Sequence, residues 1–96
     1  MLLALAAVHA TLLRPLPTHA SAGTKIVVAF ALRDFAGHPV DAKRVFVKVI
    51  CPEKDVWSIA YATDAGNGRY RVVATVPAGG LGQVRIGRGS TYYPVR

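Results

Sequence analysis

The chain of 96 residues has one cysteine, one tryptophan and no long apolar run. With Cys51 alone, no disulfide forms within the chain, and neither a zinc-binding nor a redox pair of cysteines exists. No run approaches the roughly 18 apolar residues that a membrane-spanning helix needs. These absences exclude disulfide-stapled scaffolds and helical membrane spans. Cys51 follows a valine-rich segment, and we expect it to be a buried or half-buried small apolar residue.

Acidic residues are also scarce, with five against twelve lysines and arginines, which gives a net charge of +7. All five lie in or beside segments typical of turns, where Asp commonly accepts hydrogen bonds from nearby backbone amides. We therefore interpret them as turn residues and not as a general acid and base. No serine lies in a G-x-S-x-G motif, and no Ser, His and Asp set suggests a triad. The sequence predicts no catalytic residues, no resident cofactor and no enzyme activity.

What the chain does have is apolar content, because 52% of its residues are hydrophobic. Such a composition is too apolar for intrinsic disorder. A chain of this length builds one small domain and buries about 60 to 65% of its unfolded surface. We expect a single globular core.

Apolar residues recur at every second position in segments separated by Gly, Pro, Asp and Asn. This two-residue period is typical of strands with one buried face. It predicts about seven strands, at residues 9–14, 25–33, 44–50, 57–61, 69–76, 83–86 and 91–95. No window shows a helical repeat with caps. Because two packed sheets hide both apolar faces, the prediction is an all-β, immunoglobulin-like antiparallel β-sandwich, with a small closed barrel as the rival.

The stretch DAGNGRYRVVATVPAGG shows the alternation most clearly. Successive side chains of a strand point to opposite faces. We therefore expect one face to point into the core, namely Tyr70, Val72, Ala74 and Val76. Arg69 and Arg71 should point into solvent.

Residues 1–22 allow two interpretations. Leu2 to Val8 are apolar and precede small-residue sites that end at Ala10 and Ala22, as in a secretory signal peptide that lacks its basic start. The same residues fit an edge strand followed by the proline-rich connector Pro15-Leu16-Pro17. In either case, residues 23–96 form the predicted sandwich domain.

Three motifs, LRDFAGHPVDAKRVFVKV, DAGNGRY and VPAGGLGQVRIG, resemble those of bacterial immunoglobulin-like accessory domains called YtkA-like. They are more loosely similar to macroglobulin and carboxypeptidase-regulatory-like modules. The similarity covers residues 23–88. It implies a non-enzymatic, extracytoplasmic module, periplasmic, secreted or membrane-anchored, for structural support or protein interaction. Its partner would be another protein or other domains of a longer chain.

The start His9-Ala10-Thr11-Leu12-Leu13, followed by prolines, resembles the mature N-terminus of CopC-like periplasmic copper proteins. Those proteins bind Cu(II) through an N-terminal histidine, whose amine and imidazole suit that ion. The resemblance implies His9 as a metal ligand and copper as the cofactor. This sequence lacks the aspartate and histidine that the family carries late in its chain.

Arginines gather in the second half of the chain, close in sequence to Tyr92 and Tyr93. Basic side chains beside aromatic rings suit phosphates and other anions. The sequence thus suggests an anion-binding sheet face made of Arg69, Arg71, Arg85 and Arg88. No nucleic-acid-binding module is recognisable, so no nucleic acid is expected, and an anionic surface such as a cell-wall polymer or lipid headgroups is the alternative partner.

Overall fold

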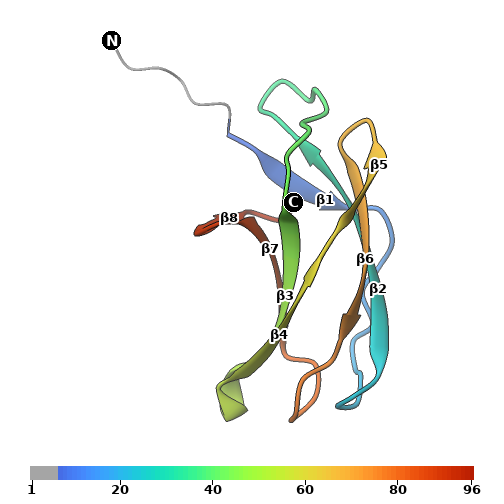
Figure 1. Cartoon of the computed structure of the whole chain (residues 1–96), viewed down its shortest axis with the longest axis vertical. Coiled ribbons are helices and arrows are strands. Elements are labelled where there is room, and N and C mark those ends of the chain that lie inside the picture. The colour runs from blue at the N-terminus through green and yellow to red at the C-terminus, as the bar shows by residue number, and fades with distance from the viewer. Residues whose placement is uncertain (1–6) are drawn as a thin grey trace.

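The computed structural model describes residues 7–96, which form eight β-strands (Figure 1). The strands are β1 His9–Leu12, β2 Lys25–Arg33, β3 Val45–Cys51, β4 Val56–Tyr61, β5 Thr63–Gly66, β6 Arg69–Thr75, β7 Gln83–Arg88 and β8 Thr91–Tyr93. A 3₁₀ turn, η1 Pro52–Lys54, separates β3 from β4. In this described part, no helix is long and apolar enough to cross a bilayer.

The strands form two four-stranded sheets that pack as two layers (Figure 1). One sheet has the order β1-β2-β6-β5 and the other has the order β4-β3-β7-β8, and neighbouring strands in each sheet are antiparallel. The chain crosses from one sheet to the other after β2, β4 and β6, and the remaining consecutive strands pair within a sheet, as in immunoglobulin-like sandwiches. The predicted all-β, immunoglobulin-like sandwich is confirmed.

One strand lies where the sequence predicts only a turn. β5 pairs with the start of β6, and a register shift between Asp64 and Gly66 marks a bulge. The Asp64 carboxylate accepts a hydrogen bond from the Gly66 amide at 2.7 Å. All four β5 residues are exposed, so no apolar alternation reveals this strand in the sequence.

The core lies between the sheets and is lined from both sides. Every residue predicted to point inward from β6 is buried, including Tyr70 at 2% exposure, and Cys51 is buried as expected. The other contributors are chiefly β-branched or aromatic, namely Ile26, Val28, Phe30, Leu32, Val45, Val47, Val49 and Ile86. β-branched side chains pack well on a pleated surface, which is why these segments form strands.

Tyr70 joins the core to the loop between β2 and β3. Its ring stacks on Phe30, with centroids 5.5 Å apart. Its hydroxyl accepts a hydrogen bond from the Ala42 amide at 2.7 Å and lies 3.1 Å from the Ala42 carbonyl oxygen and 3.3 Å from that of Val40. Burial raises the pKa of Tyr70, and the Ala42 amide opposes this shift. The Tyr70 side chain thus fills part of the core and also provides hydrogen-bond partners for the backbone of the loop.

β1 connects both sheets near the chain ends. Ala10 is fully buried and lies opposite Leu32 in β2. Its amide donates to the Pro94 carbonyl and its carbonyl accepts from the Arg96 amide, both at 2.8 Å. Residues 9–12 therefore belong to the sandwich. Cleavage after Ala22 would remove this strand, and cleavage after Ala10 would remove its first two residues. Of the apolar stretch that suggests a signal peptide, residues 2–6 lie outside the described residues.

Candidate interaction face

The outward side of β4 carries three large apolar side chains. Trp57, Ile59 and Tyr61 are exposed at 52%, 49% and 60%, whereas the alternate residues point toward the core side. We call these three residues the β4 row. Burying such side chains is favourable by about 1.5 to 3 kcal/mol each. Leaving three of them side by side in solvent therefore gives the molecule an unpartnered apolar strip.

Register extends the β4 row across the sheet. Trp57 lies opposite Ile50, Ile59 opposite Lys48, and Tyr61 opposite Phe46. On the other side of β3, Lys48 lies opposite Arg85 of β7. Side chains at opposed positions share one face and interact across strands. The outward side of this sheet is thus a single surface, which we call the aromatic-basic face: Phe46, Lys48, Ile50, Trp57, Ile59, Tyr61, Arg85 and Tyr92.

Gly87 allows two aromatic rings, those of Phe46 and Tyr92, to come into contact at one end of this face. It lies between Phe46 and Tyr92 in the ladder. A Cβ atom there would stand 2.6 Å from the Thr91 carbonyl oxygen and 2.9 Å from the Tyr92 ring. With no side chain in the way, the Phe46 and Tyr92 rings meet edge to face, with centroids 5.9 Å apart.

A cation lies over each of three aromatic rings. The Lys48 ammonium is 4.5 Å from the centroid of Trp57, and the Arg85 guanidinium is 3.9 Å from that of Tyr92. At one end, the Arg44 guanidinium lies 5.8 Å from the Tyr61 ring. Cation-π contacts of this kind are worth about 0.5 to 1 kcal/mol at exposed sites. They favour an arrangement in which cations and rings alternate across the face.

Positive charge on this face is unopposed within its own strands. β3, β4, β7 and β8 contain no Asp or Glu. At one end, a concavity of about 440 Å³ is lined by three basic residues, the rings of Phe46 and Tyr61, and Gly89. The basic residues are Lys43, Arg44 and Arg88, and the Arg88 side chain is held by a 2.9 Å hydrogen bond to the Lys43 carbonyl oxygen. The arrangement suits a carboxylate or another anion.

The four arginines that the sequence suggests as one anion-binding face are divided between the sheets. Arg69 and Arg71 are exposed on β6, in the sheet that contains β1 and β2. Arg85 lies on the aromatic-basic face, and Arg88 lines its basic concavity. The structure thus places Arg85 against Tyr92 and Arg88 in the concavity at the end of the same sheet.

Sequence reasoning did not select Arg44, Lys48 or the β4 row as functional residues. A signal was available, since Phe46, Lys48 and Ile50 alternate with the buried valines of β3 and so share its other side. What places Trp57 and Tyr92 beside them is the pairing of β3 with β4 and of β7 with β8. That pairing links residues far apart in the chain.

The three histidines lie on different segments. His9 begins β1 opposite Arg33, and His19 lines a groove beside β2. His38 lies on the loop after β2, where its Nδ1 is 3.3 Å from a carboxylate oxygen of Asp34. Among residues 7–96, no three His, Cys, Asp or Glu side chains gather in a way that could hold a metal ion. Among the described residues, His9 therefore belongs to no such group.

Comparison with protein-family models, with curated proteins and with solved structures finds no match to this chain.

Proposed function

We propose that the chain is a non-enzymatic interaction module whose aromatic-basic face binds an acidic surface on a partner protein. The observation that carries this proposal is the exposed β4 row beside Lys48 and Arg85, on four strands without a carboxylate. Apolar area supplies the affinity of such a contact, and the charges select the partner and orient it.

Side-chain chemistry favours a protein as the partner. Residues that dominate protein interfaces are enriched in Trp, Tyr and Arg and cluster near the centre of the contact. The face combines these types in Trp57, Tyr61, Tyr92 and Arg85. A second copy of this chain is disfavoured because a symmetric contact would bring together two basic faces whose strands contain no carboxylate, and like charges brought together weaken association.

The basic concavity would receive an acidic side chain of the partner. Lys43, Arg44 and Arg88 line it, and a carboxylate there could accept charge-assisted hydrogen bonds. The Phe46 and Tyr61 rings border the same space and would exclude water from that contact. This end of the face would therefore fix the register of the complex.

We place the module outside the cytoplasm, as a periplasmic, secreted or membrane-anchored domain. The support is the resemblance of residues 23–88 to YtkA-like domains, whose expected fold class the two-sheet sandwich matches. A net charge of +7 would also draw the module toward anionic partners.

Site-specific cross-linking in the source cell identifies the partner. A photoreactive residue at Ile59 should give one discrete protein adduct. The same group at Val73, which is also exposed but lies on β6 in the other sheet, should not. Equal adducts from both positions, or an adduct from Val73 alone, would contradict the proposal.

Binding of the identified protein in purified form then tests the chemistry. Trp57→Ala and Arg85→Glu should each weaken the complex about tenfold or more, which is about 1.4 kcal/mol. Arg71→Glu changes the net charge as much as Arg85→Glu does, but on the other sheet, and it should leave affinity within about threefold. If Arg71→Glu and Arg85→Glu weaken retention on a sulfated polysaccharide resin equally and no protein adduct forms, binding is to a polyanion through general charge.

A further inference from the structure

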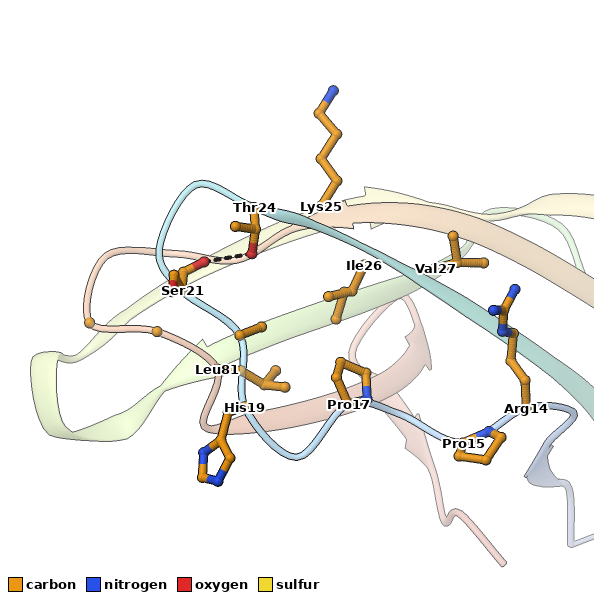
Figure 2. A pocket seen from close by; sticks show the side chains of 13 residues that line it. Arg14, Pro15, Pro17, His19, Ser21, Thr24, Lys25, Ile26, Val27 and Leu81 are labelled. Atoms are coloured by element: carbon orange, nitrogen blue, oxygen red, sulfur yellow. Dashed lines mark hydrogen bonds between the residues drawn. The ribbon is translucent and has the colours of Figure 1, made fainter.

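A groove of about 700 Å³ runs beside the first half of β2 (Figure 2), in the sheet that does not carry the aromatic-basic face. It lies between β2 and the connector that follows β1. Residues 14–21 of the connector form one wall, and the loop at 79–81 lies at one end. The bottom of the groove is apolar, with Pro17, Ile26 and Leu81 grouped in the middle of the view in Figure 2.

The side of β2 that faces this groove has free backbone groups. The β1 ladder ends at Leu12 opposite Phe30, and one further bond joins the Leu13 amide to the Ala29 carbonyl at 2.8 Å. In an antiparallel strand, the N–H and C=O groups of alternate residues point to the same side. The groups of Lys25 and Val27 therefore point as those of Ala29 do, and no backbone bond from that side reaches them among the described residues.

The described connector does not pair with this edge. Pro15 and Pro17 have no amide hydrogen to donate to a neighbouring strand. Farther along, the Ala20 carbonyl is engaged by the Leu81 amide at 3.0 Å, which ties the connector to another loop. The chain thus leaves β2 after Leu13, and the edge at residues 25–28 stays open.

The groove is positively charged. In Figure 2, Arg14 and Lys25 project to the same side, with Val27 between them, and His19 points away on the other side. No Asp or Glu lines this space. An exposed lysine on an edge strand discourages pairing with apolar strands from other molecules. The same lysine, beside Arg14, would favour a strand that carries an acidic side chain.

We propose that this groove accepts an extended peptide segment, which adds to the open edge of β2 as a continuation of β1. Its backbone pairs with Lys25 and Val27, as in known cases of strand addition. An acidic side chain lies between Arg14 and Lys25, and the neighbouring side chains, which point the other way, contact Ile26 and Leu81. The site is separate from the aromatic-basic face, and the two can succeed or fail independently.

A short peptide of alternating valine and glutamate is the probe, and its binding to the whole chain is followed by fluorescence anisotropy. Saturable binding is expected. The same peptide methylated on alternate backbone nitrogens, so that one edge cannot donate, should bind at least tenfold more weakly. Equal binding of the two peptides would overturn strand addition, as would no binding at all.

Two variants at one position localise the contact. Val27→Pro removes the edge amide, and proline is tolerated at strand edges, so peptide binding should fall at least tenfold. Val27→Ala keeps the amide and should bind nearly as the parent does. Equal effects of the two would contradict the proposal.

A charge reversal gives a second test that does not depend on the folding of Val27→Pro. The double variant Arg14→Glu with Lys25→Glu should lose the valine-glutamate peptide and gain a valine-lysine peptide. If the double variant does not prefer the valine-lysine peptide, the proposed position of the acidic side chain is wrong. Trp57→Ala, on the other sheet, should leave peptide binding unchanged, which keeps this test distinct from that of the proposed function.

Discussion

β4 and β6 carry nearly the same sequence pattern but use it in opposite ways. Both alternate large apolar residues with smaller or polar ones. In β6 the large residues point inward, and Tyr70 is 2% exposed. In β4 they point outward, and Tyr61 is 60% exposed. Alternation thus identifies a strand without saying which of its sides meets the core.

The neighbours of each strand determine which of its sides faces the core. β6 lies between β2 and β5, so it is central in its sheet, and its large side chains fill the space between the layers. β4 is an edge strand, and the inward positions between Trp57 and Tyr61 hold small residues, Ser58 and Ala60. The Ser58 hydroxyl donates to the Thr75 carbonyl at the end of β6, so the two strands approach closely there. A tryptophan would not fit that gap.

The largest expected effect is a difference in stability between two truncations. Tyr70→Ala removes a buried ring that stacks on Phe30 and should lower the free energy of unfolding by about 3 to 5 kcal/mol. Trp57→Ala removes a larger but half-exposed ring and should cost about 1 kcal/mol or less. Urea denaturation followed by circular dichroism measures both. Similar losses for the two variants would break the comparison between β6 and β4.

Tyr70→Phe separates the core role of the ring from the role of its hydroxyl. The substitution keeps the stack on Phe30 but leaves the Ala42 amide without its 2.7 Å partner. This hydrogen bond is part-buried, so the unsatisfied amide should cost about 1 kcal/mol, the low end for a buried donor, in urea denaturation. Tyr61→Phe, at an exposed position of β4, is the matched control and should change stability by less than about 0.5 kcal/mol.

The pH dependence of the free energy of unfolding should also differ between the parent and Tyr70→Phe. Burial raises the pKa of Tyr70 above its ordinary value of 10.0. The folded state therefore holds this proton more tightly than the unfolded state does. Its contribution is fully present below the ordinary pKa and is lost as pH rises through the raised value. Unfolding free energies from about pH 9 to about pH 11 should fall more steeply for the parent than for Tyr70→Phe. Parallel profiles would contradict burial of this hydroxyl.

The smallest expected effect concerns the cation over Trp57. Lys48→Ala removes an ammonium 4.5 Å from the ring centroid and should cost about 0.5 to 1 kcal/mol. A double-mutant cycle with Trp57→Ala isolates the coupling between the two side chains. A coupling energy of zero would show that Lys48 and Trp57 share the face without interacting. It would contradict a stabilising cation-π contact between them.

Much of the sandwich could be predicted from sequence because its cause is local. The inward residues of β6 and the burial of Cys51 follow from alternation and small apolar character. β5 could not be predicted, since its Asp and Gly residues are typical of turns and its pairing depends on β6. The aromatic-basic face was also out of reach, because Lys48, Trp57 and Tyr92 meet only through strand pairing.

Trp57 is the only tryptophan of the chain, so its fluorescence reports directly on the β4 row. Quenching by iodide and by neutral acrylamide, measured on the dilute protein alone, tests whether this row faces solvent. We expect efficient quenching by both reagents and an emission spectrum typical of a solvent-exposed tryptophan, with protection only when the partner is added. Emission that is blue-shifted and shielded from both quenchers in the isolated protein would contradict it.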